Sequence, residues 1–254
     1  MTIDSTRPHV GRIYDFVLGG HHNFESDRAA AQQMLKFIPS YPTWARLNRW
    51  FLQMVAERWA SSGHRYILDL GSGMPTQGHF HDMARDARVL YSDHDMVTVA
   101  YAREVIGDNP LVEYVHADVR EPEELLAAAD RLFGGERQVA IGFIGVSYFF
   151  DDDQMARVMR ELHRWAAPGS LMALSYLHYV PRSADTRAVE EHLRRQSAEV
   201  FPRQEADIRR LSAPWRVQEI KALTTWLEVE ELVQEADRQG NDVEMYGALL
   251  THEG

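Results

Sequence analysis

From His64 onward, short apolar runs alternate with longer stretches in which apolar residues recur at helical spacing. Short apolar runs between turn residues are typical of buried strands, and recurrence every three or four residues is typical of amphipathic helices. The pattern predicts strands near residues 66–70, 88–92, 111–116, 138–144 and 170–176, with helices near 78–86, 95–106, 121–133 and 153–166. Strands and helices that alternate in this way predict an α/β fold, in which helices cover both faces of a mostly parallel sheet.

The first part of the chain lacks such strand runs and is predicted to be helical. One helix is expected at Asp27–Phe37, with Ser26 as its cap, and a second at Pro42–Ala60, which should end at the following Ser-Ser-Gly. Residues 1–62 are therefore expected to form an N-terminal helical cap that precedes a sheet-containing core over residues 63–254.

The last part of the chain begins with a long, charged stretch. Residues 184–210 have a helical pattern that Pro202 interrupts, and they predict a lid insertion over about 184–212. The segments expected after the insertion are a helix near 216–224 and two strands near 226–232 and 244–252. The two strands should form an antiparallel pair at one edge of the sheet.

The composition is that of a protein with a full hydrophobic core, because 45% of its 254 residues are apolar. No repeat or linker divides the sequence, so we expect a single domain over residues 1–254. The chain has no cysteine, which excludes disulfides and suits a reducing cytoplasm. Its net charge of −11 disfavours nucleic acid as a partner, and no apolar stretch reaches the length of a membrane span. A cytoplasmic protein with no membrane partner is therefore expected.

The segment from Tyr66 to Thr76 carries the strongest functional signal. Its apolar run stops at Gly71 and Gly73, and a helix is expected to follow. A strand, a tight glycine turn and a helix are the opening of a nucleotide-binding unit, in which glycines let the backbone approach the ligand closely. This segment therefore predicts a nucleotide-binding loop.

Acidic residues end the next two predicted strands. Asp93 lies 20 residues after Gly73, where a carboxylate can accept hydrogen bonds from both hydroxyls of a ribose. Asp118 ends the third strand and is placed to meet an adenine edge. The three strand ends together predict an adenosine cofactor.

Two features favour S-adenosylmethionine (SAM) over a dinucleotide. The third glycine of a dinucleotide loop is replaced here by Thr76, which follows Pro75. Asp69, two residues before Gly71, gives the Asp-x-Gly-x-Gly pattern of SAM enzymes. NAD remains the alternative cofactor, and an NAD-dependent oxidoreductase the alternative enzyme.

Several blocks of the chain have a composition that secondary structure alone does not require. They are Pro8–Phe24, Asn48–Leu52, Gly71–His81, Tyr91–Asp95 and His116–Asp118, and the first contains the run Tyr-Asp-x-x-Leu-Gly-Gly. In these blocks the chain resembles the SAM-dependent methyltransferase family that is abundant in actinobacteria and was long catalogued as a domain of unknown function. The resemblance implies a Rossmann-like class I methyltransferase with a mostly parallel seven-stranded sheet. It also implies S-adenosylhomocysteine (SAH) as the product.

The N-terminal block is expected to fold over the bound cofactor. Paired glycines at positions 19 and 20 permit a close backbone approach, and Tyr14 and Asn23 can both donate hydrogen bonds. The resemblance implies the same placement. The residues predicted to bind the cofactor are Arg12, Tyr14, Gly20, Asn23, Asp69, Gly71, Ser72, Gly73, Thr76, Asp93, His94, Asp118, Val119, Gly145 and Val146.

Candidate catalytic residues follow the fourth and fifth strands, because open α/β sheets bind ligands at the carboxyl ends of their strands. His178 has a suitable ordinary pKa for a general base, and Tyr148 could present its ring to the sulfonium. A histidine with a purely structural role is the alternative for His178, and a core position is the alternative for Tyr148. The acids Asp151–Asp153 are interpreted as a helix cap, and no metal site is predicted.

The function predicted from the sequence is a SAM-dependent methyltransferase that acts on a small-molecule acceptor, by O- or N-methylation in secondary metabolism. A SAM-binding regulatory or scaffold protein without transfer activity is the alternative from outside the enzymes. A homodimer is left open.

Overall fold

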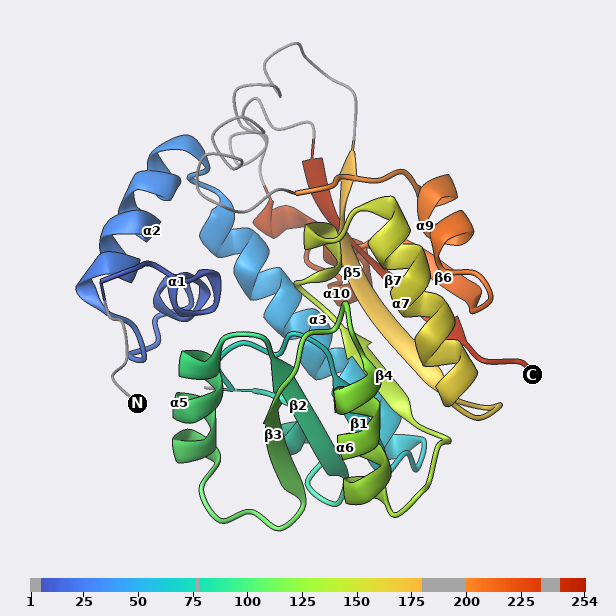
Figure 1. Ribbon diagram of the computed structural model, residues 1–254. Helices are drawn as coiled ribbons and strands as arrows, with labels where there is room; N and C mark the ends of the chain where they lie inside the picture. The colour runs from blue at the N-terminus through green and yellow to red at the C-terminus, as the bar shows by residue number, and fades with distance from the viewer. Residues whose placement is uncertain (1–5, 76–77, 180–199, 234–242) are drawn as a thin grey trace.

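Seven strands form one mixed sheet in the order β3-β2-β1-β4-β5-β7-β6 (Figure 1). The computed structural model describes residues 6–75, 78–179, 200–233 and 243–254. The strands are β1 (Tyr66–Asp69), β2 (Arg88–Asp93), β3 (Val112–His116), β4 (Ala140–Phe143), β5 (Leu171–Tyr179), β6 (Arg216–Ala222) and β7 (Val243–Thr251). Strands β1 to β5 run parallel, and β7 lies antiparallel between β5 and β6. The predicted mostly parallel seven-stranded sheet is confirmed.

Helices cover both faces of this sheet. The helices of the described residues are α1 (Val10–Val17), α2 (Glu25–Phe37), α3 (Tyr41–Ser61), α4 (Phe80–Met83), α5 (Met96–Ile106), α6 (Glu123–Phe133), α7 (Asp152–Trp165), α9 (Glu205–Leu211) and α10 (Leu223–Leu227), with short 3-10 turns η1 (Ser147–Phe149) and η2 (Glu230–Leu232). Successive strand residues point to opposite faces. Leu68 therefore packs with α6 and α7, which lie in front of the sheet in Figure 1, while Ile67 packs with α3 behind it.

The residues before β1 are helical, as predicted, and α1 packs against both α2 and α3. The predicted cap at Ser26 is wrong. Helix α2 begins at Glu25, and the carboxylate of Asp27 accepts a hydrogen bond from the backbone N–H of Phe24 at 2.8 Å. An acid three residues into a helix can satisfy the free N–H at its start, so Asp27 replaces the serine in this role.

The predicted helix near 216–224 is wrong, because residues 216–222 form the edge strand β6. A β-bulge between Val217 and Glu219 inserts an extra residue into this strand. Val217 and Ile220 consequently both pack against the core although they are three positions apart. The bulge thus gives a strand the apolar spacing of a helix.

The predicted strand near 226–232 is also wrong. This segment forms the end of α10 and the turn η2, and the indole N–H of Trp226 donates to the carbonyl of Gly247 at 3.0 Å. Trp226 and Leu227 pack on the α3 side of the core. Tertiary packing therefore overrides the β propensity of the sequence. The helix predicted near 78–86 is also shorter, since α4 spans only Phe80–Met83.

The predicted lid over residues 184–212 lies partly outside the described residues, which resume at position 200. In its described part, the backbone N–H of Phe201 donates to the carbonyl of Tyr148 at 2.8 Å, and α9 packs against α7 and β6. No helix in the described part of the chain has the length and apolar content needed to cross a membrane.

Candidate functional site

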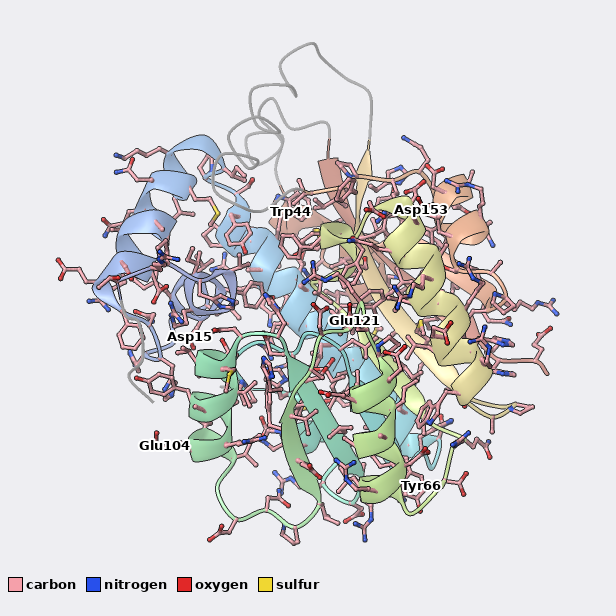
Figure 2. All side chains as sticks on the ribbon, in the orientation of Figure 1. Asp15, Trp44, Tyr66, Glu104, Glu121 and Asp153 are labelled. Atoms are coloured by element: carbon pink, nitrogen blue, oxygen red, sulfur yellow. The ribbon has the colours of Figure 1, made fainter. Side chains whose placement is uncertain are left out.

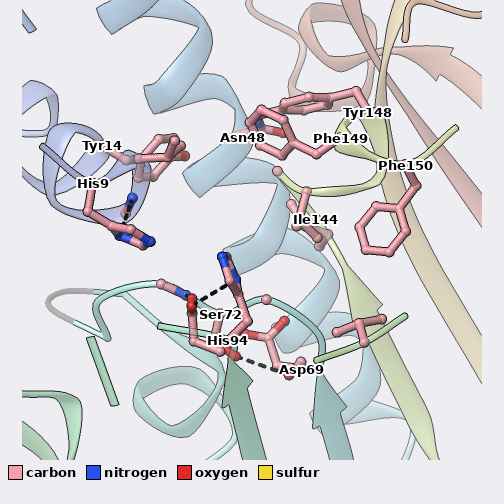
Figure 3. Close-up of a pocket in the computed structure, with 18 of the residues that line it drawn as sticks. His9, Tyr14, Asn48, Asp69, Ser72, His94, Ile144, Tyr148, Phe149 and Phe150 are labelled. Carbon is pink, nitrogen blue, oxygen red and sulfur yellow. Dashed lines mark hydrogen bonds and ion pairs between the residues drawn. The ribbon is translucent and has the colours of Figure 1, made fainter. Parts of the chain in front are cut away.

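A cavity of about 570 Å³ opens at the carboxyl ends of the parallel strands. Its wall includes the last residues of β1 and β2, Asp69 and Asp93, and the residues that follow β3 and β4, Asp118 and Gly145. Figure 3 shows Asp69, Ser72 and His94 on one side, Asn48, Tyr148 and Phe149 on the opposite side, and His9 and Tyr14 to the left. The predicted strand-end residues are therefore brought together around one cavity.

The glycine loop after β1 is held by its own backbone and by β2. Gly71 has a φ of 62°, and a Cβ there would lie 2.8 Å from Cγ2 of Val146. The backbone N–H of Ser72 donates to the carbonyl of Ser92 at 2.7 Å, and its hydroxyl donates to the carbonyl of Asp69 at 3.0 Å. Gly71 thus needs both a left-handed backbone and the absence of a side chain, which leaves the loop open to a ligand.

Asp93 joins the end of β2 to this loop. It is 5% exposed, and its carboxylate accepts hydrogen bonds from the backbone N–H of Gly73 at 3.1 Å and of Asp95 at 2.9 Å. The phenol of Tyr114 donates to the carbonyl of Gly73 at 2.6 Å from the other side. Because a carboxylate has about four lone-pair directions, Asp93 can still accept hydrogen bonds from a ligand in the cavity.

Asp118 and Val119 form the wall beyond β3. The guanidinium of Arg120 donates to both carboxylate oxygens of Asp118, to Oδ1 at 2.9 Å and to Oδ2 at 2.6 Å. This pairing with Arg120 lowers the pKa of Asp118. The carboxylate therefore stays ionised, but it is shared with an arginine, which leaves less of it for an adenine edge than the sequence suggested.

The N-terminal segment closes one side of the cavity, where His9 and Tyr14 line the wall. The ring of His9 lies 5.8 Å from the ring of His94, which follows β2. The phenol of Tyr14 donates to the carbonyl of Ala45 in α3 at 2.8 Å. The segment is thus held against α3 and faces the glycine loop. Of the N-terminal residues predicted to bind the cofactor, Tyr14 lines the cavity.

Three other N-terminal residues from the predicted set, Arg12, Gly20 and Asn23, do not line the cavity formed by the described residues. Arg12 forms a buried ion pair with Asp27 at 2.8 Å. Asn23 donates to the carboxylate of Asp15 at 3.0 Å, and a Cβ at Gly20 would overlap that carboxylate (Asp15 is labelled in Figure 2). These residues shape the segment that carries His9 and Tyr14. Thr76, another predicted residue, lies outside the described residues.

His178 also lies away from the cavity wall that the described residues form. Its ring stacks on Tyr246 of β7 with centroids 4.2 Å apart, and burial lowers its pKa. Tyr148, the other predicted catalytic residue, does line the cavity. The geometry therefore favours the structural role for His178 and keeps Tyr148 at the site.

Helix α3 contributes cavity residues that the sequence analysis missed, namely Tyr41, Asn48, Arg49 and Leu52. Asn48 is 3% exposed, and its Oδ1 has no hydrogen-bond partner in the described part of the chain. The polar pair Asn48 and Arg49 among the apolar residues of α3 is a signal in the sequence, but the sequence alone does not indicate which face of α3 meets the cavity.

His79 lies buried at the same wall. Its Nε2 is 3.0 Å from the carbonyl of Met74. A carbonyl only accepts, so Nε2 carries the proton and Nδ1 is left as an acceptor, which has no partner among the described residues. Burial lowers the pKa of His79 well below its ordinary value, and the nearby charge of Arg49 lowers it further. His79 is therefore a neutral acceptor.

The acids after β4 act as a helix cap, as predicted. The carboxylate of Asp151 accepts a hydrogen bond from the backbone N–H of Gln154 at 2.8 Å at the start of α7. Asp152 forms ion pairs with Arg203 at 3.2 Å and with Arg210 at 2.9 Å. Asp151 and Asp152 thus stabilise the start of α7 and its contacts with neighbouring arginines.

The sequence profile of a family described as S-adenosyl methyltransferase matches residues 1–251. A crystal structure of a candidate methyltransferase from Thermobifida fusca is 28% identical to the chain, with a TM-score of 0.87 over 99% of this chain and 97% of the other. A DUF574 family protein from Streptomyces avermitilis is 25% identical, with a TM-score of 0.81 over 98% and 99% of the two chains. Among curated proteins, no sequence match was found.

A more distant structural neighbour is the cyclopropane synthase MmaA2 from Mycobacterium tuberculosis. It is 12% identical, with a TM-score of 0.56 over 78% of this chain and 83% of the other. At this identity the likeness is one of fold alone, and it agrees with the strand order of the sheet.

Proposed function

The chain belongs to the S-adenosyl methyltransferase family, and we propose that it methylates a small aromatic molecule bound beside Asn48 and neighbouring aromatic side chains. Asn48 is the observation that carries the proposal, because it lines the cavity and its buried Oδ1 has no partner among the described residues. A buried acceptor without a partner costs about 1–3 kcal/mol. An acceptor molecule that donates a hydrogen bond to Asn48 would remove this cost.

The residues around the glycine loop fit SAM. Gly71 leaves space that a side chain would fill, and Asp93 retains lone pairs that ribose hydroxyls can use. When bound, SAM supplies a methyl group on a positively charged sulfonium. The task of the protein is then to align the acceptor with that methyl group and to exclude water.

Tyr14, Tyr41 and Tyr148 supply neutral aromatic walls. All three line the cavity, and burial raises the pKa of each phenol above its ordinary value. They therefore remain protonated near neutral pH. Neutral aromatic faces attract a cation such as a sulfonium, and they also bury a flat apolar molecule well. Together these residues support an aromatic acceptor.

Asn48 is suited to orient the nucleophile of that acceptor. An amide oxygen accepts a hydrogen bond but does not take the proton near neutral pH. The nucleophiles that suit such a residue are an amine with a free lone pair and a hydroxyl acidic enough to ionise with little help. The proposal is accordingly N- or O-methylation of a small aromatic molecule.

The acceptor can be sought with the purified protein and labelled SAM. Panels of aromatic amines, phenols, aliphatic analogues, RNA and unrelated proteins would be offered in parallel. The proposal expects label in the aromatic small molecules. Label in RNA or protein alone would contradict it.

With the acceptor found, Asn48→Leu is expected to reduce the rate of methyl transfer by about 30-fold, which is the loss of a hydrogen bond worth about 2 kcal/mol. Leucine keeps the volume but cannot accept a hydrogen bond. SAH affinity, measured by calorimetry, should stay within about twofold of the parent value. Unchanged transfer by Asn48→Leu would remove Asn48 from the proposal.

The carboxyl group of Asp69 is expected to make the affinity for SAM and SAH depend on pH. Burial raises the pKa of this carboxyl to about 7, although the charge of Arg49 acts against the rise. We propose that the ionised carboxylate pairs with the ammonium group of SAM or SAH. Because the ligand then binds the deprotonated form, affinity should rise as the pH rises through 7 and level off above it.

The expected change is about a tenfold tighter binding of SAH at about pH 8 than at about pH 6. Calorimetry at several pH values measures it. In Asp69→Asn, the position no longer titrates, so the dependence should disappear. An equally steep dependence in Asp69→Asn would show that another group is responsible.

A further inference from the structure

Arg49 brings a guanidinium to the cavity, and no carboxylate of the described residues forms an ion pair with it. Its Nη1 is buried and has no hydrogen-bond partner among the described residues. Two other arginines in this part of the molecule are neutralised by carboxylates, Arg12 by Asp27 and Arg120 by Asp118. A charged group with a buried polar atom is normally paired with a group of opposite charge. An anionic group of a ligand is therefore the expected partner of Arg49.

The strand order indicates which part of bound SAM would lie beside Arg49. The cavity follows the carboxyl ends of β3, β2, β1 and β4 in that order, and its wall there is formed by Asp118, Asp93, Asp69 and Gly145. If adenine lies at the first of these and ribose at the second, the amino-acid end of SAM lies over β1. The charge of Arg49 acts there, since it is among the charges that lower the pKa of Asp69.

The amino-acid end of SAM is a zwitterion, with an ammonium and a carboxylate on the same carbon. Asp69 can pair with the ammonium, and the unprotonated Nδ1 of His79 offers a further acceptor at the same wall. The carboxylate then needs a cation close to these acceptors. A guanidinium suits it well, because its planar N–H groups match the two oxygens of a carboxylate.

We propose that Arg49 binds the carboxylate at the amino-acid end of SAM and SAH. This inference rests on the proposed placement of the cofactor along the strand ends. It gives α3 a direct part in cofactor recognition. Arg49 and Asn48 are consecutive on that helix, so one helix turn would hold the methyl donor through Arg49 and the acceptor through Asn48.

The test compares two ligands that differ only at the proposed contact. SAH carries the amino-acid end, whereas 5′-methylthioadenosine has the same nucleoside and a thioether but neither the ammonium nor the carboxylate. Calorimetry with Arg49→Gln is expected to show SAH binding weakened by about 30-fold. Methylthioadenosine binding should change by less than about twofold, which also shows that the variant retains a folded cavity.

Two further variants sharpen the result. Arg49→Lys keeps the charge without the planar fork, so its SAH affinity should lie between those of the parent and Arg49→Gln. Arg46→Gln removes an exposed arginine of the same helix and should bind both ligands as the parent does. An equal loss for SAH and methylthioadenosine, or no loss for either, would overturn the inference.

These outcomes are distinct from a failure of the proposed function. If SAH binds the parent and weakens selectively in Arg49→Gln, the contact stands even when no aromatic acceptor is methylated. If SAH binds the parent and Arg49→Gln equally well, the contact is wrong although the methyl transfer can still be right.

Discussion

Replacing Asp93 with alanine is expected to weaken the binding of SAH by about a thousand-fold. The carboxylate is placed to accept hydrogen bonds from both ribose hydroxyls, and each bond to a charged acceptor is worth about 1.5–3 kcal/mol. The substitution also removes the acceptor for the backbone N–H of Gly73, so the glycine loop loses one of its supports. Calorimetry with SAH measures the loss, and thermal unfolding shows whether the fold is retained.

Two variants separate the ribose contact from a general effect of charge. Asp93→Asn keeps one acceptor oxygen and should bind SAH more tightly than Asp93→Ala but more weakly than the parent. Asp108→Ala removes an exposed acid that does not line the cavity formed by the described residues, and it should leave SAH affinity unchanged. Parent-like binding by Asp93→Ala would place the ribose elsewhere.

The strand-end residues could be predicted from the sequence because their positions follow from local rules. A parallel strand ends where its apolar run ends, and the carboxyl ends of neighbouring strands meet at one edge of the sheet. Asp93 and Asp118 were identified in this way, and both line the cavity. Neither step requires knowledge of contacts between distant parts of the chain.

The helical residues of the site could not be predicted with the same rules. Arg12 and Arg49 both lie in blocks that resemble the methyltransferase family, yet their surroundings differ. Arg12 pairs with Asp27, whereas Arg49 has a buried nitrogen that no described residue satisfies. Which arginine meets a protein acid depends on how α1, α2 and α3 pack, and this packing is set by contacts that a single sequence does not display.

Deleting residues 1–24 is expected to abolish SAH binding while the sheet remains folded. The deletion removes Pro8, His9, Gly11 and Tyr14, which form the wall of the cavity beside the glycine loop. Without this wall, the ligand would be open to water, and its contacts with the strand ends would be weakened by the high dielectric constant of the solvent. The loss of affinity should exceed the range that calorimetry can measure.

The deletion also takes away Arg12, the ion-pair partner of Asp27, together with α1, which packs against α2. The loss of both would leave an unpaired carboxylate at the start of α2 and destabilise that helix. The deletion is therefore best combined with Asp27→Asn, with the full-length Asp27→Asn protein as the matched control. Circular dichroism should show that helices and strands persist in both proteins. If the shortened, folded protein binds SAH as tightly as its control, the segment serves stability or the acceptor, and Tyr14 does not belong to the cofactor site.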